Sequence, residues 1–168
     1  TGLIGKKLTK KLIERGDEVF ILSRSVDSAK QIIPYASGYI EWGNNSNAWQ
    51  SELSGVEAVI HLAGENVMGR RWSAAHKKKV LESRVNGTKS LVDAISRLDV
   101  KPKTFISASA IGIYGNRENP VDESSAPAHG FLGNVVKAWE AETHKVDELG
   151  IRRVNVRTGI VLDEKEGA

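Results

Sequence analysis

The chain has 168 residues, a length that suits one domain. Its composition, with 40% hydrophobic and 27% charged residues, is ordinary for a globular protein. It contains no cysteine, which excludes disulfides, thiolate metal sites and cysteine nucleophiles and favours a cytoplasmic location. The net charge of +3 is mildly basic, but the basic clusters lack a base-reading motif and no apolar run approaches a membrane span, so we expect neither nucleic-acid nor membrane partners.

The first half of the chain predicts one helix and three strands. Leucines and isoleucines at helical spacing indicate an amphipathic helix over residues 3–15, which Gly16 would end. Strands are predicted at 19–22, 38–42 and 56–62. Residues 19–22 are all apolar, which is typical of a parallel strand that is covered on both faces.

The second half continues the alternation of helices and strands. A helix at 73–98 precedes a strand at 104–110, and a helix at 131–150 precedes a strand at 151–162. The loop at 111–130 is long enough to be functional or disordered. This order predicts a doubly wound α/β fold of Rossmann type, with a mostly parallel sheet and helices on both faces.

A doubly wound fold needs a strand before its first helix. In the strand order 3-2-1-4-5-6 that strand lies at the centre of the sheet, between the strands predicted at 19–22 and 56–62. We therefore expect the natural protein to extend upstream by about one strand and the first glycines of a loop. On this interpretation residues 1–168 are a single partial domain.

Two short patterns point to a dinucleotide. In "TGLIGKKL", Gly2 and Gly5 stand at a helix start, where free N–H groups and the helix dipole favour a pyrophosphate. About 20 residues further on, NAD-binding domains carry an acidic residue, whereas "LSRS" places Ser23 and Arg24 there. An arginine can bind the 2′-phosphate of NADP, so the pattern favours NADP over NAD. A surface arginine at a strand end is the alternative.

Several segments together resemble a known superfamily. "TGLIG", "LSRS", "HLAGEN" with "RRW", "SRVNGTKSLVDAI", "SASAIGIYG" and "RTGIVL" occur in the order seen in extended short-chain dehydrogenase/reductases. More narrowly, the chain resembles their nucleoside-diphosphate-sugar epimerase-like family from end to end. The resemblance implies an NADP-binding Rossmann domain, followed by a C-terminal substrate lobe that is absent from residues 1–168.

The resemblance also implies which residues contact NADP. Residues 62–64 would lie against adenosine and ribose, Arg84 near the cofactor and Val161 near the nicotinamide end. Strand core and a helix-surface charge are the alternatives. We assign His61 to packing or a polar contact, and expect no metal site. The full set of implied cofactor residues is Gly2, Leu3, Ile4, Gly5, Ser23, Arg24, Leu62, Ala63, Gly64, Arg84 and Val161.

The acid–base pair of the superfamily, Tyr-x-x-x-Lys, is missing. None of the chain's tyrosines is followed four residues later by a lysine. If Glu140 is the glutamate that commonly follows that lysine, the two positions hold Leu132 and Val136, which cannot exchange a proton. Lys137 is one position away, about 100° around the helix. The usual mechanism therefore cannot be carried over.

Other candidate catalytic residues lie around the strand at 104–110. Ser109 best matches the superfamily's active-site serine, with Ser107 as the alternative, and Tyr114 could face the same cleft or pack structurally. Asp122 and Glu123 are plausible substrate contacts or solvated turn residues.

The sequence thus predicts an NADP(H)-binding protein, oxidoreductase-like or epimerase-like, that acts on a small molecule such as a sugar nucleotide. A non-catalytic NADP-binding regulatory or interaction protein is the alternative. The pattern does not indicate an oligomeric state.

Overall fold

Helices and parallel strands alternate along the chain in the computed structural model, which describes residues 1–43, 48–68 and 71–164. The elements are α1 (Leu3–Arg15), β1 (Phe20–Ser23), α2 (Val26–Ile32), β2 (Gly38–Glu41), α3 (Ala48–Ser51), β3 (Ala58–His61), α4 (Ala74–Ser96), β4 (Thr104–Ala110), the 3₁₀ helix η1 (Ile111–Ile113), α5 (Phe131–His144), the 3₁₀ helix η2 (Asp147–Leu149) and β5 (Arg152–Thr158). The predicted α/β class is confirmed.

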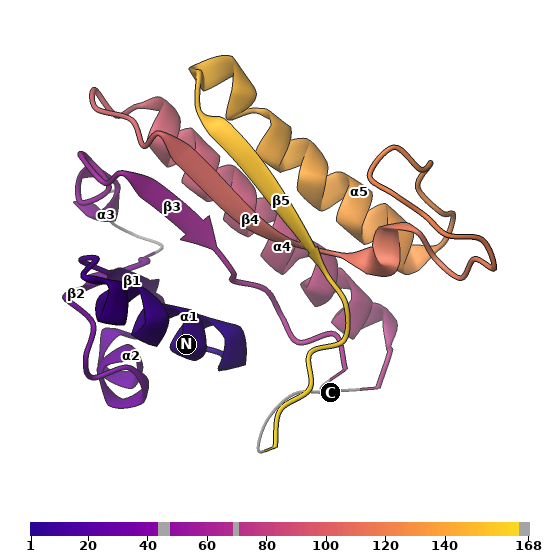
Figure 1. Cartoon of the computed structure of the whole chain (residues 1–168), viewed down its shortest axis with the longest axis horizontal. Helices are drawn as coiled ribbons and strands as arrows, with labels where there is room; N and C mark the ends of the chain where they lie inside the picture. Colours follow the sequence, from indigo (N-terminus) through magenta and orange to yellow (C-terminus); the bar gives the residue numbers. More distant parts are fainter. Residues whose placement is uncertain (44–47, 69–70, 165–168) are drawn as a thin grey trace.

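The strands form two parallel sheets. β1 pairs with β2, and β3, β4 and β5 pair in that order, with Ser109 opposite Arg157. Within the described residues no ladder joins β1 to β3, which is where the predicted strand order places its first strand. Figure 1 shows α4 and α5 side by side along the three-stranded sheet, while α1, α2, β1 and β2 group at the other side of the molecule.

The main core lies between α4 and the sheets. Leu91 and Ile95 of α4 are buried with Phe105 of β4, and the cluster reaches Ile40 of β2 and Trp49 of α3. Phe105 is fully buried, so its truncation to alanine is expected to cost about 3–5 kcal/mol. This core holds the carboxyl end of β3 against α4, and so positions the loop that follows β3.

Three details differ from the sequence prediction. The sequence predicts that the strand at 19–22 is covered on both faces, but Phe20 of β1 is 51% exposed, and β2 is the strand that pairs with β1 among the described residues. The helix expected over 131–150 ends at His144, and Gly150 instead ends η2 in a left-handed conformation. The short helices α2 and α3 were not predicted, although Ser25 caps α2 by accepting from the Ser28 amide.

No helix in the described part of the chain is long and apolar enough to cross a membrane.

Candidate functional site

The carboxyl ends of β3, β4 and β5 point to one edge of their sheet, and the loops that follow them meet there (Figure 1). In open α/β sheets ligands bind at this edge. Three groups of predicted site residues can be followed in the structure. They are the start of α1 with the end of β1, the loop after β3, and the ends of β4 and β5.

The start of α1 is open to an anion. Gly2 is the N-cap residue and supplies no side chain to cap the helix, and the first turn holds no acidic residue. A Cβ atom added at Gly2 or at Gly5 would meet no other atom within 4 Å. The first amides of a helix have no partner inside the helix, so this end can donate hydrogen bonds to a phosphate.

Ser23 and Arg24 lie at the end of β1, and their side chains differ in whether hydrogen-bonding groups remain free for a ligand. The Ser23 hydroxyl is used locally, because it donates to the Ser25 carbonyl (3.1 Å) and accepts from the Ser25 amide (3.3 Å). Arg24 is exposed and makes no hydrogen bond or ion pair with any residue that the structure describes. Arg24 is therefore the side chain that remains available for a phosphate at this position.

The loop after β3 is held by α4. Arg84 donates from Nη1 to the carbonyls of Glu65 (3.0 Å) and Val80 (3.1 Å), and Ser83 accepts from the Glu65 amide (3.0 Å). A Cβ atom at Gly64 would lie 3.1 Å from Cζ of Arg84. Glycine thus allows the guanidinium to lie directly against the backbone of this loop.

The charge of Arg84 has no carboxylate partner within the described residues. The guanidinium carbon lies 5.2 Å from the ring centre of Trp139 on α5, within the range of a cation–π contact. Burial lowers the pKa of Arg84, and the more distant charge of Glu65 opposes this shift. Arg84 therefore remains a cation, and its contacts among the described residues are two backbone carbonyls and the Trp139 ring.

His61, at the end of β3, is a packing residue as expected. It is 3% exposed and lies edge-on to Trp42 and near Phe105, and its Nε2 atom has no partner in the described structure. Burial, with the charge of Arg84 added, lowers the pKa of His61 to about 4. His61 is therefore neutral at neutral pH. The described residues contain no cluster of histidine and carboxylate groups that could hold a metal ion.

A second group of polar residues lies between β4, β5 and α5. Ser109 donates a hydrogen bond to Oε1 of Glu140 (2.5 Å), and Arg157 donates to both carboxylate oxygens of Glu140 (2.9 and 2.8 Å). Burial raises the pKa of Glu140, but the bonds from Arg157 and Ser109 outweigh it and keep the pKa below its usual value. The bonds to Glu140 raise the pKa of Arg157. The pair is therefore ionised.

The same network reaches Tyr114. Arg157 donates from Nη1 to the Tyr114 hydroxyl (2.7 Å), and its guanidinium lies 5.2 Å from the centre of the Tyr114 ring. An arginine can only donate, so the phenol accepts and keeps its own proton for another acceptor. The opposite holds for Ser109, whose hydroxyl donates its hydrogen bond to Glu140 and has only lone pairs left for a ligand. Of the two predicted catalytic residues, Tyr114 is the one that can donate.

Leu132 and Val136 occupy the two positions of the missing acid–base pair, and neither side chain can exchange a proton. Leu132 is 36% exposed at the start of α5, and Val136, one turn later, is buried. Lys137 lines a cavity of about 370 Å³ beside the long loop, and Glu140 and Arg157 line the same cavity. Ser107, the alternative to Ser109, is fully buried and donates to the neighbouring carbonyl of Ala108.

The structure thus brings together Gly64 with Arg84, and Ser109 with Tyr114 through Glu140 and Arg157. Within the described residues, no hydrogen bond or ion pair joins either group to Arg24, Val161 or the start of α1. The sequence prediction did not single out Arg157. The available signal was its place in "RTGIVL", but its partners depend on strand register and helix packing.

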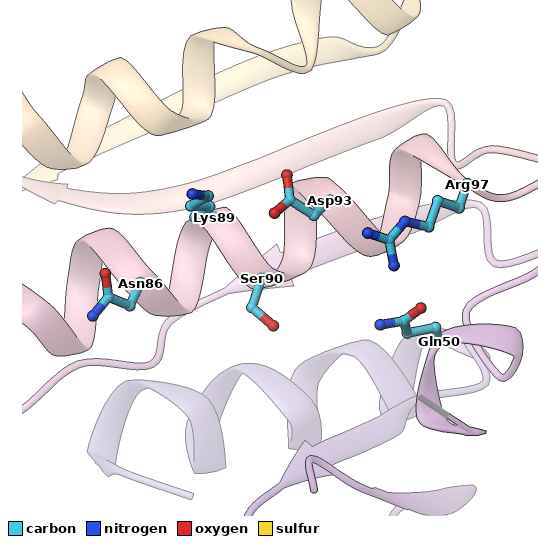
Figure 2. A pocket seen from close by; sticks show the side chains of 6 residues that line it. All are labelled: Gln50, Asn86, Lys89, Ser90, Asp93 and Arg97. Carbon is cyan, nitrogen blue, oxygen red and sulfur yellow. The ribbon is translucent and has the colours of Figure 1, made fainter. Parts of the chain in front are cut away.

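A second cavity, of about 330 Å³, lies away from this edge. Figure 2 shows it along the C-terminal half of α4, facing Gln50 of α3. The residues that line it are Gln50, Asn86, Lys89, Ser90, Asp93 and Arg97. None of the predicted site residues is among them, so this groove is separate from the candidate site.

Comparison with known proteins places the chain in a family. Residues 1–134 match the model of the NAD dependent epimerase/dehydratase family. The chain belongs to this family. Its curated relatives include the epimerase family protein YfhF of Bacillus subtilis, 37% identical over 167 residues, and the epimerase family protein Mb2239 of Mycobacterium bovis, 35% identical over 169 residues. The matches cover 98% and 99% of this chain but 54% and 53% of the relatives, so the chain spans about half of their length.

Solved structures of epimerases agree with this assignment. Human epimerase family protein SDR39U1, crystallised with NADPH, is 31% identical and superposes with a TM-score of 0.80 over 99% of this chain and 54% of its own. UDP-glucuronic acid 4-epimerase from Bacillus cereus, in complex with NAD, has a TM-score of 0.79 over 99% of this chain and 56% of its own. At 19% identity, it shows the fold alone. The resemblance of the sequence to epimerase-like extended short-chain dehydrogenase/reductases is confirmed.

Proposed function

We propose that this chain is the partial domain that binds NADP(H) in an oxidoreductase-like or epimerase-like protein of the NAD dependent epimerase/dehydratase family. The observation that carries the proposal is Arg24, an exposed guanidinium without a partner in the described structure, at the position where NAD-binding domains carry an acid. The solved human relative, crystallised with NADPH, supports the same cofactor.

The residues present fit a dinucleotide phosphate. The uncapped first turn of α1, with open space at Gly2 and Gly5, would take the pyrophosphate, with Leu3 and Ile4 contributing backbone amides. Arg24 would bind the 2′-phosphate, and Ser23 would shape the turn that carries it. Residues 62–64 and Val161 are exposed at the loops after β3 and β5, where they would contact the rest of the cofactor.

When bound, the cofactor would supply hydride transfer. The chain would supply positioning and a proton. Tyr114 can donate its hydroxyl proton to a substrate oxygen, while Ser109, which is only 2% exposed, would act by holding Glu140 and through it Arg157 beside Tyr114. The proposed substrate is a small molecule such as a sugar nucleotide, and the proposed location is the cytoplasm.

A non-catalytic NADP-binding role is the second candidate function. Two observations favour it. The side chains of Leu132 and Val136 are apolar, and the Ser109 hydroxyl donates its hydrogen bond to Glu140. Turnover separates the two functions. Consumption of NADPH by the full-length protein with any member of a carbonyl and sugar-nucleotide panel would contradict a purely binding role.

The cofactor assignment is tested by calorimetric titration of full-length protein with NADPH and NADH. We expect NADPH to bind at least about tenfold more tightly, because a guanidinium–phosphate contact is a charge-assisted pair. Arg24→Ala should remove most of this difference by weakening NADPH binding alone. Arg152→Ala, at an exposed arginine of β5, is the matched control and should preserve the preference. Equal affinity of the unmodified protein for both cofactors would overturn the assignment.

A further inference from the structure

Trp72, the last residue of the "RRW" segment, is an exposed aromatic side chain that none of the proposed cofactor contacts uses. It is 42% exposed, although its indole Nε1–H donates a hydrogen bond to the Val67 carbonyl (3.1 Å). This bond fixes the polar edge of the indole while a large share of the ring stays in solvent. An aromatic ring held open in this way is available to pack against a ligand.

Phe131 and Lys77 form a cluster with Trp72. The ring centres of Trp72 and Phe131 lie 5.8 Å apart, with the planes at 70°. Nζ of Lys77 lies 5.9 Å from the centre of the Trp72 ring and 5.4 Å from that of Phe131, within the range of a cation–π contact. These three side chains, called the aromatic cluster below, join the start of α4 to the start of α5.

The aromatic cluster carries a positive charge that no carboxylate of the described residues neutralises. Lys77 forms no ion pair in this part of the chain, whereas the next residue, Lys78, pairs with Glu82 (3.7 Å). The first turns of α4 and α5 hold no acidic residue, and the exposed Arg71 precedes Trp72. Charge complementarity therefore favours a ligand that combines a ring with an anionic group.

The aromatic cluster lies at the edge where β3, β4 and β5 end, which is where open α/β sheets bind ligands (Figure 1). Leu132, which follows Phe131, occupies the tyrosine position of the superfamily and is 36% exposed. A Cβ atom at Gly112 would lie 3.5 Å from Cβ of Leu132, and the neighbouring Ile111 is 51% exposed. The exposed apolar surface thus continues from the aromatic cluster to the end of β4, beside the place where a substrate would react.

We propose that Trp72 and Phe131 form a platform for a ring of the substrate, and that Lys77 pairs with a phosphate next to that ring. In a sugar nucleotide, both the sugar and the base lie next to a phosphate, so either ring has the required chemistry. This inference rests on the proposed function, and it names residues of this chain that would recognise the substrate instead of the cofactor.

The competing interpretation is that Trp72 only braces the loop after β3 through its bond to Val67. Two substitutions separate the interpretations. Trp72→Phe keeps an aromatic ring but removes the Nε1–H donor, whereas Trp72→Leu keeps apolar bulk and removes both the ring and the donor. A brace is lost in both variants, while a platform is lost in Trp72→Leu alone.

The first test is acrylamide quenching of tryptophan fluorescence in the full-length protein, with UDP-glucose as the probe and NADP⁺ present. Trp72 is the exposed tryptophan among the described residues, since Trp42 is half-buried and Trp49 and Trp139 are buried. UDP-glucose should protect Trp72 from acrylamide, and this protection should be absent from the Trp72→Phe spectrum. Uridine monophosphate and glucose 1-phosphate, tested separately, show whether the base or the sugar lies on the platform.

The second test is calorimetric titration of the variants with UDP-glucose. Trp72→Leu should weaken binding about tenfold or more, the loss of one stacked ring, and Trp72→Phe should weaken it much less. Met68→Ala is the matched control, because Met68 is an apolar side chain of the same loop and is 71% exposed. It should leave the affinity unchanged.

The charge of the aromatic cluster is tested in the same way. Lys77→Gln should weaken UDP-glucose binding about tenfold, because a charge-assisted contact to a phosphate is lost. Lys78→Gln removes the neighbouring charge, which Glu82 already pairs, and should leave the affinity unchanged. Equal losses in the two lysine variants would overturn the pairing of Lys77 with the phosphate.

The remaining outcomes decide between a platform and a brace. Equal weakening by Trp72→Phe and Trp72→Leu would overturn the platform, and so would unchanged quenching of the unmodified protein at saturating UDP-glucose, a result that needs no variant to fold. If UDP-glucose, uridine monophosphate and glucose 1-phosphate all fail to bind, the inference is wrong. NADPH titration of the same sample separates the two levels, because NADPH binding leaves the proposed cofactor function standing and its absence contradicts that function too.

Discussion

Arg84 and Arg157 both extend toward α5, yet their surroundings differ. Arg157 forms two hydrogen bonds with the carboxylate of Glu140 and a third with Tyr114, and the pairing raises its pKa. Arg84 has two backbone carbonyls and the Trp139 ring, and burial lowers its pKa. The first arginine is satisfied by the protein itself. The second has no partner for Nε and Nη2 within the described residues, so the two arginines differ in how far the protein itself satisfies them.

Breaking the Glu140 pair should have the largest effect on stability. Glu140→Gln leaves Arg157 without a counter-charge in a largely buried position, so we expect a loss of about 3 kcal/mol in the free energy of unfolding. Urea denaturation measures this loss. Glu142→Gln, on the same helix, removes the partner of the exposed Lys145 and should cost at most about 1 kcal/mol.

The loss from Glu140→Gln should depend on pH. The pKa of Glu140 is lower in the folded protein than in the unfolded chain. Its stabilisation is therefore fully present above the unfolded value of about 4.3 and disappears as the pH falls toward the folded value. A difference between wild type and variant that stays constant at acid pH would contradict the ionised pair.

The second prediction concerns the pKa of His61, which burial lowers and the nearby charge of Arg84 lowers further. The pKa of His61 is about 4 in the folded protein, against about 6.5 when unfolded, so the unfolded chain binds more protons between these values. Stability should fall by roughly 2 kcal/mol as the pH drops from about 6.5 to about 5. In the His61→Phe variant, the free energy of unfolding should lose this part of its pH dependence.

Arg84→Met is the companion variant for the pH experiment. Removal of the nearby charge should raise the pKa of His61 toward its usual value, although burial remains the larger cause of its depression. Histidine resonances in NMR spectra report this pKa. No change in Arg84→Met would show that Arg84 does not act on His61.

The smallest effect is expected at Gly64. A Cβ atom there would press on the end of the Arg84 side chain, which can move, so Gly64→Ala should cost no more than about 1 kcal/mol in urea denaturation. Gly5→Ala meets no atom within 4 Å and lies in a helix, so it should not destabilise the protein. A loss above about 2 kcal/mol for Gly64→Ala would show that the guanidinium is rigidly fixed.

Sequence reasoning found the longer elements and failed for the short ones. The helices α1, α4 and α5 have clear apolar periodicity, but the seven residues of α2 and the four of α3 are too short for such a signal. The prediction that β1 is covered on both faces was wrong for Phe20, because an apolar run does not reveal which elements pack over each face of a strand. The predicted cofactor residues and the NADP preference await the titrations above.

The sequence by itself determined the α/β alternation, the two glycines at a helix start and an arginine where an acid is usual, because these depend on local spacing. Tertiary structure alone decided that Glu140 pairs with Arg157, and that no carboxylate of the described residues pairs with Arg84. Those pairings depend on the register of β4 against β5 and on the packing of α4 and α5. Long-range contacts of this kind leave no periodic signal, because the partners are far apart in the chain.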